Sequence, residues 1–148
     1  MSNMVVDKLS TLLQKNKTVF SRKDYTTGTI LEIPYNIVNK EAKINIEILS
    51  LYDDDSYMIG FSKTITEDDI DEVYTELLDI NASLLHGRLS VKKSTKEVNY
   101  SMTVPVSEND KLGFQEYRKK LQYCFSVYFM LCDNGIIEKE EYIENVEV

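Results

Sequence analysis

Two alternating runs of apolar and polar residues, separated by a short polar turn, constrain this chain more than any other feature. The apolar positions are Leu89 and Val91 before the turn at 93–96, and Val98, Tyr100, Met102 and Val104 after it. Side chains of a strand point alternately to the two faces of a sheet. The pattern therefore predicts a β-hairpin with one buried face.

A helix is expected directly before this hairpin. Its apolar residues recur with helical spacing and are Ile70, Val73, Tyr74, Leu77, Leu78, Leu84 and Leu85. Thr66 is expected to cap the helix, and the acidic residues 67–69 suit the positive end of its dipole. Gly87 is expected to end it in a left-handed conformation. Asn81 falls within the apolar stripe, so we expect its amide to bond to backbone at the helix end or in the hairpin.

The rest of the chain predicts further strands between two more helices. Residues 3–15 form an amphipathic helix, and strands are expected at 19–20, 29–33, 44–49 and 57–61, with Gly28 and Pro34 bounding the second and an acidic turn at 53–56 before the last. Capping residues 107–110 then precede a long helix, 111–132, closed by residues 133–135. The fold class is α+β, an antiparallel sheet with helices in the order α-β-β-β-β-α-β-β-α, as a single domain spanning 1–148.

The last helix has two apolar faces. The main stripe is Phe114, Tyr117, Leu121, Cys124, Phe125, Tyr128 and Cys132. At 100° per residue, Tyr123, Val127 and Met130 fall on the opposite side. Either the C-terminal segment 136–148, with Tyr142, Ile143 and Val146, folds over this second face, or the three residues form a subunit or partner interface.

Charge and composition limit the partners. The chain has 148 residues, 43% of them hydrophobic, and a formal net charge of −8, which disfavours nucleic acid and anionic membrane surfaces. No run approaches about 18 apolar residues, and no signal peptide pattern opens the chain. We therefore expect a cytoplasmic protein.

No catalytic or metal-binding pattern is present. Cys124 and Cys132 have no Cys-x-x-Cys spacing and are expected to be core thiols. His86, the only histidine, is expected to serve a loop, and Asp53 and Asp55 lack the glycine and glutamate of a calcium loop. We expect no cofactor and no enzymatic activity. The alternative is a small-ligand binder or enzyme whose site joins distant residues, such as His86 with residues 53–55.

The order of elements resembles the bacterial YbjN-like domains and the related type III secretion chaperone-like fold. The resemblance is carried by residues 77–81 (Leu-Leu-Asp-Ile-Asn), 87–91 (Gly-Arg-Leu-Ser-Val) and 98–104 (Val-Asn-Tyr-Ser-Met-Thr-Val). Secretion chaperones of this class are small acidic homodimers that hold an extended segment of another protein. The segment 136–148 lies outside the resemblance as a C-terminal addition.

Together these features predict a non-enzymatic protein-binding module, chaperone-like or regulatory and of bacterial origin. Its partner would be a protein or peptide segment, bound at the sheet face, an edge strand or the second face of the last helix. A homodimer is expected.

Overall fold

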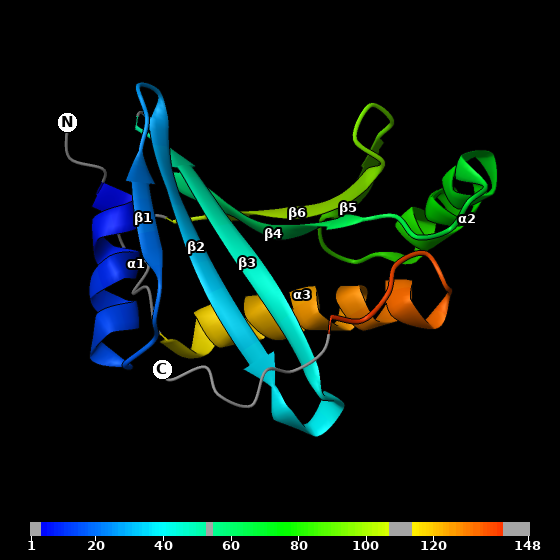
Figure 1. Cartoon of the computed structure of the whole chain (residues 1–148). Coiled ribbons are helices and arrows are strands. Elements are labelled where there is room, and N and C mark those ends of the chain that lie inside the picture. Colours follow the sequence, from blue (N-terminus) through cyan, green and yellow to red (C-terminus); the bar gives the residue numbers. More distant parts are fainter. Residues whose placement is uncertain (1–3, 53–54, 107–113, 141–148) are drawn as a thin grey trace.

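The computed structural model of the protein describes residues 4–52, 55–106 and 114–140. Within them lie helices α1 (Met4–Lys15), α2 (Ile70–Ser83) and α3 (Phe114–Asp133), and a short 3-10 turn, η1 (Val38–Lys40). The strands in these ranges are β1 (Ser21–Asp24), β2 (Gly28–Ile37), β3 (Ala42–Leu51), β4 (Ser56–Thr64), β5 (Arg88–Lys92) and β6 (Glu97–Pro105). The predicted α+β class and order of elements are confirmed (Figure 1). No helix in the described ranges combines the length and apolarity needed to cross a membrane.

All six strands join one antiparallel sheet in the order β1-β2-β3-β4-β6-β5. The predicted alternation is confirmed, because one side of each central strand is buried. The buried residues of β3 and β4 include Ile44, Ile46, Ile48, Tyr57, Ile59 and Phe61. The opposite side carries mostly exposed residues, such as Asn45 and Glu47. The sheet therefore has an inner and an outer face.

The sheet forks between β3 and β4. These strands pair only from Glu47–Gly60 to Leu49–Met58, whereas β2 pairs with β3, and β4 with β6, along their full lengths. One arm is thus β1-β2-β3 and the other β4-β6-β5 (Figure 1). A Cβ atom on Gly60 would overlap the backbone carbonyl of Tyr100. Only glycine fits where β4 turns away from β3 and follows β6.

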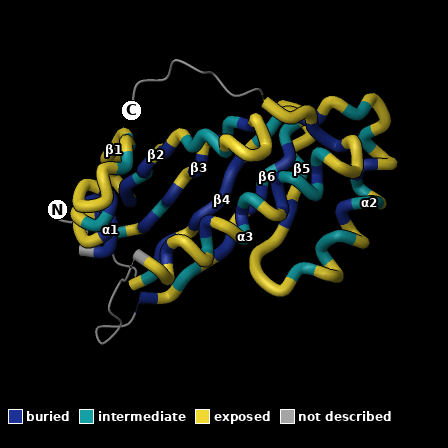
Figure 2. Tube along the Cα trace, turned by 90° about the horizontal axis from the view of Figure 1, so that it is seen from below, coloured by how far each residue is buried: buried dark blue, intermediate teal, exposed yellow. Residues whose placement is uncertain are grey.

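The helices α1 and α3 cover the inner face (Figure 2). The predicted amphipathic character of α1 is confirmed, since Val6, Leu9 and Leu13 are fully buried. The helix α3 spans both arms of the fork. Near its start, the hydroxyls of Tyr117 and of Tyr35 on β2 lie 2.7 Å apart in a hydrogen bond. Near its end, the Tyr128 ring meets the Phe61 ring of β4 edge-on at 5.7 Å.

The end of α3 predicted at residues 133–135 is confirmed, because the helix ends at Asp133. Gly135 has φ +72°, the Ile136 N–H donates to the Leu131 carbonyl and the Gly135 N–H to the Cys132 carbonyl, each at 3.0 Å. These paired bonds are a Schellman motif, which turns the chain back along the helix. The expected caps at 107–110 and helix start at 111 lie outside the described residues.

The segment after α3 bridges the arms of the fork. The Thr66 N–H donates to the Ile136 carbonyl at 3.0 Å and the Lys43 N–H to the Glu140 carbonyl at 2.9 Å. The Lys63 ammonium lies 2.9 Å from the Glu140 carboxylate, and Ile136 and Ile137 are buried. Residues 136–140 are therefore an integral part of the domain. Residues 141–148, with Tyr142, Ile143 and Val146, lie outside the described residues.

The helix α2 lies beside β5 at one end of the molecule (Figure 1). Asn81 accepts a hydrogen bond from the Leu89 N–H at 2.8 Å and donates one to the Leu89 carbonyl at 3.0 Å. The bond predicted for Asn81 is confirmed. In an antiparallel strand both backbone groups of a residue point to the same side, so Asn81 occupies the outer edge of β5.

Both ends of α2 differ from expectation. Its cap is Asp69, whose carboxylate accepts from the Asp71 N–H at 3.1 Å and the Glu72 N–H at 3.2 Å. Thr66 does not cap it, because it lies three residues before Asp69 and its N–H and hydroxyl both donate to the Ile136 carbonyl, at 3.0 Å and 3.5 Å. The helix ends at Ser83, before Gly87. Gly87 does adopt the predicted left-handed conformation, with φ +78°, but in the turn that enters β5.

Two strand boundaries were also predicted wrongly. The first strand is Ser21–Asp24 and follows Val19 and Phe20. Pro34 lies inside β2, opposite Asn45, and does not end the strand. The Lys43 N–H points away from β2, and by alternation so does that of Asn45. The nitrogen of Pro34 therefore faces the β1 side, beyond the last β1–β2 pair, where no ladder bond is lost.

Candidate functional site

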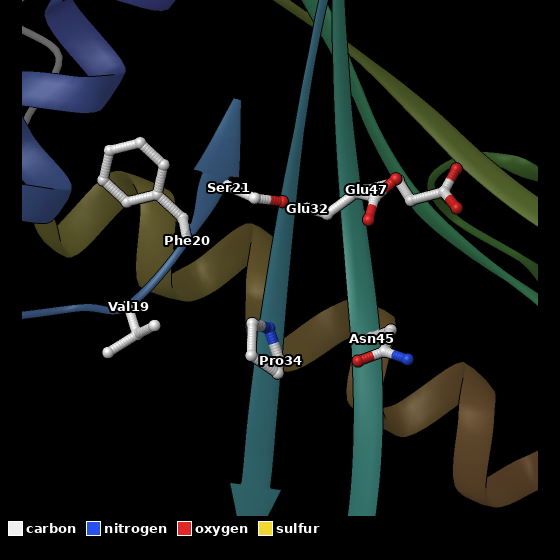
Figure 3. A pocket seen from close by; sticks show the side chains of 7 residues that line it. All are labelled: Val19, Phe20, Ser21, Glu32, Pro34, Asn45 and Glu47. Carbon is white, nitrogen blue, oxygen red and sulfur yellow. The ribbon is translucent and has the colours of Figure 1, made fainter. Parts of the chain in front are cut away.

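The outer face of the sheet is hollowed on both sides of the fork. A depression of about 380 Å³ lies over β1, β2 and β3 and is lined by Val19, Phe20, Ser21, Glu32, Pro34, Asn45 and Glu47. In Figure 3, Val19 and Phe20 stand on one side of it and Glu47 and Asn45 on the other. A second depression, of about 140 Å³, lies over β3, β4 and β6. Glu47 lines both, and we call the two together the outer groove.

The register of the strands sets the polar centre of the groove. Ser21 lies opposite Glu32, Glu32 opposite Glu47, and Glu47 opposite Gly60. Cross-strand neighbours on one face have their Cβ atoms within about 5.5 Å. The two carboxylates are thus direct neighbours, as Figure 3 shows, and Gly60 contributes no side chain beyond Glu47.

The groove is acidic, and its carboxylates have little counter-charge among the described residues. Partial burial, then the nearby carboxylates of Glu32 and Glu97, raise the pKa of Glu47. Lys23 approaches Glu32 only to 3.9 Å, with both side chains largely in solvent. The described residues that line the two depressions include no lysine, arginine or histidine. A cation would therefore be stabilised at the centre of the groove.

Apolar side chains flank this acidic centre. Ile30, Leu49 and Met58 lie side by side across β2, β3 and β4. Met58 is 38% exposed and Leu51, at the end of β3, 46% exposed. At the other end of the groove, Phe20 and Pro34 line the larger depression. The outer groove can therefore bind a ligand that is apolar at both ends and cationic in the middle.

The sequence contained part of the signal for this groove. Glu47 alternates with the buried isoleucines of β3, and this alternation by itself indicates the solvent face on which it lies. Glu32 lies between the buried Leu31 and Ile33 in the same way. Their adjacency depends on the register between β2 and β3, which periodicity does not specify.

The predicted second face of α3 is largely used inside the chain. Val127 is 1% exposed and belongs to the core, so it is not available to another molecule in this structure. Tyr123 is half-buried, and its hydroxyl accepts hydrogen bonds from the Leu85 N–H at 2.9 Å and the His86 N–H at 3.4 Å. The loop after α2 thus covers Tyr123. Met130 is half-buried, and an interface at Tyr123 and Met130 stays a prediction.

The apolar stripe predicted for α2 is only partly buried. Val73 and Leu77 are inside, but Leu78 is 71% exposed and Leu85, in the following loop, 83% exposed. Leu85 contacts Tyr123 through its backbone. A second exposed apolar area therefore adjoins the α3 face for which an interface is predicted.

His86 and the cysteines have structural surroundings. The His86 ring packs edge-on against Tyr123, with 5.2 Å between centroids, and its carbonyl accepts a hydrogen bond from the Tyr100 hydroxyl at 2.7 Å. Burial raises the pKa of Cys124 to about 12 and also raises that of Cys132. Both thiols are therefore protonated and weakly nucleophilic at neutral pH.

The acidic turn at 53–56 is only partly described. Asp53 and Asp54 lie outside the described residues, so the arrangement of this turn with His86 stays untested. Within the ranges that the structure describes, no three His, Cys, Asp or Glu side chains are grouped to hold a metal ion.

The chain matches no family model, no curated protein and no solved structure. The resemblance to YbjN-like domains and secretion chaperones is therefore still a sequence-based expectation. The groove itself has to supply the functional argument.

Proposed function

We propose that this protein is a non-enzymatic binding module that holds a segment of another protein against the outer groove. The observation that carries this proposal is a hollowed sheet face that no described helix covers and that bears an apolar row, Ile30, Leu49 and Met58, beside two carboxylates. Clustered apolar surface with a polar rim is typical of interaction sites. Two open depressions in line suit an elongated partner better than a compact small molecule.

Contact through the face is favoured over addition to a sheet edge. At β5 the backbone groups of Leu89 are already bonded to Asn81. At the other edge, β1 has four residues, all exposed, and Arg22 is tied to Asp7 of α1 at 2.8 Å. Short, charged or covered edges resist pairing with another strand. The partner would therefore be recognised mainly by its side chains.

The resemblance noted in the sequence supports a chaperone-like or regulatory role of this module, in a bacterial cytoplasm. It also supports a homodimer. For the dimer we propose the end of the molecule where Leu78 and Leu85 are exposed and the Leu85 N–H donates to the Tyr123 hydroxyl. Met130 is the further residue predicted for this interface. In Figure 1, α2 lies at the opposite end from β1 and β2, so self-association there would leave the larger depression accessible.

A peptide selection tests the proposal. Random 12-residue peptides displayed on phage are selected on the immobilised protein, and amide chemical shifts of the labelled protein then locate the bound peptides. We expect peptides that shift the amides of Glu47, Leu49 and Met58. A Met58→Ser variant should weaken their binding about tenfold, because it removes apolar surface from the row without changing the charge of the groove.

The matched control is Leu78→Ser, which makes the same kind of change on the exposed face of α2 and should change peptide affinity less than about twofold. Light scattering of the same variant tests the dimer, which it should weaken. Failure to recover peptides that bind the outer groove would refute the proposed function. Recovery of a small metabolite with the purified protein, displaced by no peptide, would favour the ligand-binding alternative.

A further inference from the structure

The outer groove has the charge pattern of a site for a basic segment. Glu32 and Glu47 are direct cross-strand neighbours, and the described lining includes no basic side chain. Like charges directly opposite each other in a sheet are unfavourable. A cation placed between them relieves this repulsion, so the groove is complementary to positive charge.

The surrounding charges limit where that cation can lie. Lys23 is beside Glu32 at the β1 edge, and Lys43 lies on the outer face of β3, two residues beyond Asn45. Glu97, across the fork on β6, adds negative potential at Glu47. The most negative position is therefore near Glu47, between the two lysines and on the side toward β6.

The chemistry of the lining favours an organic cation over a metal ion. Two carboxylates and the Asn45 amide offer hydrogen-bond acceptors, while Phe20 and Pro34 offer apolar surface. A guanidinium group is planar, bonds carboxylates through two N–H groups and stacks on apolar rings. Its aliphatic stem can lie along apolar surface while the charged end reaches the acids.

We propose that the partner segment held in the outer groove is basic, with an arginine side chain seated between Glu32 and Glu47 and apolar residues on either side of it. This inference rests on the proposed function and names the chemistry of its partner. Alternate residues of an extended peptide point to one face, about 6.6 Å apart. A segment of the pattern apolar-x-Arg-x-apolar therefore matches the order Phe20 and Pro34, the carboxylates, then Leu49 and Met58.

Two synthetic peptides test it directly. The probe is acetyl-Phe-Ser-Arg-Ser-Leu-amide, and its twin carries citrulline, which has the shape of arginine without the charge. Binding is followed by the amide shifts of Glu32, Asn45 and Glu47 in the full-length protein. We expect the arginine peptide to bind about tenfold more tightly than its twin, a ratio typical of a charge-assisted pair.

The protein variant that probes the same contact is Glu47→Gln, which keeps the shape and removes the charge. It should weaken the binding of the arginine peptide about tenfold and change the affinity for the citrulline peptide by less than about twofold. The control is Asp79→Asn, at an exposed position of α2, which changes the net charge equally and should leave both peptides within about twofold.

Equal binding of the two peptides to the groove would overturn the basic-partner inference and leave the proposed function in place. The same holds if library peptides bind the groove but neither synthetic peptide does. An equal loss in Glu47→Gln and Asp79→Asn would show attraction to the net charge of the protein and would also overturn the inference.

Discussion

Replacing Asn81 with alanine should lower the free energy of unfolding by about 2 kcal/mol. The side chain makes two hydrogen bonds to one residue, accepting from the Leu89 N–H at 2.8 Å and donating to the Leu89 carbonyl at 3.0 Å. Leu89 is 3% exposed, so water can replace these two bonds only in part. Asn81→Ala would leave both backbone groups of an edge strand unpaired.

The magnitude combines a loss and a smaller gain. An unpaired buried backbone group costs about 1–3 kcal/mol, and the half-buried position of Asn81 lets some water in, so we take the lower half of that range for each group. Alanine in the helix returns up to about 0.7 kcal/mol. The control is Ser83→Ala on the same helix, whose hydroxyl donates only to the nearby Ile80 carbonyl at an exposed site. It should change stability by less than about 0.5 kcal/mol.

Denaturant unfolding measures both variants, and hydrogen exchange of the Leu89 amide reports the local effect. Asn81→Ala should shift the unfolding midpoint and speed exchange at Leu89, and Ser83→Ala should do neither. The variant Asn81→Asp provides a second test. Its carboxylate can still accept from the Leu89 N–H, but it has no donor for the Leu89 carbonyl. Protonation restores the donor, so this variant should approach wild-type stability as the pH falls below about 4. If Asn81→Ala and Ser83→Ala prove equally stable, with unchanged exchange at Leu89, the edge-capping argument is wrong.

Three further substitutions test other features of the fold, each through its effect on the free energy of unfolding. Ser10→Ala should raise the free energy of unfolding by about 1 kcal/mol, because the buried Ser10 hydroxyl has no hydrogen-bond partner in the described parts of the chain. The control Ser50→Ala should lower the free energy of unfolding, because it loses a bond to the Ser56 carbonyl at 2.9 Å. A loss of stability in both variants would contradict this reasoning. Gly60→Ala should lower the free energy of unfolding by about 3 kcal/mol or more, because the new Cβ atom clashes with β6. Gly135→Ala should lower it by only about 1–2 kcal/mol, because Gly135 has φ +72° but open space around it. Similar losses in the two variants would mean that the clash at Gly60 is relieved. Glu47→Gln should stabilise the fold at pH 7, because the raised pKa of Glu47 means that ionisation of this carboxyl opposes folding. The gain in stability should vanish as the pH falls below the unfolded-state pKa of about 4.3. A gain that does not depend on pH would refute ionisation of Glu47 as its cause.

The sequence predicted the helices and strands that bury one face, because such burial requires apolar residues at a regular spacing. The alternating isoleucines of β3 are buried, and the apolar residues of the β5–β6 hairpin are buried or half-buried on one face, so their pattern is regular. The strand β1 has no such pattern, because all four of its residues are exposed. It exists through its pairing with β2. A short polar edge strand therefore cannot be found by periodicity alone.

The candidate site was harder to predict than the fold because it depends on register and on the fork. Glu32 and Glu47 are fifteen positions apart on strands separated by the η1 turn, and only their pairing makes them neighbours. Val127 shows a different limit of the sequence. Helical geometry correctly set it apart from the main stripe of α3, but the core reaches around the helix and buries it. A helical wheel gives directions and not what lies in each direction.

The fork connects the stability of this domain with its proposed binding surface. Where β3 and β4 separate, backbone groups lose their partners, and residues 136–140 supply replacements through Ile136, at Thr66, and Glu140, at Lys43. On the outer face, Glu47 and Gly60 form the last β3–β4 pair before the strands separate, so no side chain stands opposite Glu47 on β4. The residues that close the fork and those that line the groove are different sets. The charge of the groove, on which the proposed choice of partner depends, can therefore change without loss of the contacts that hold the two arms together.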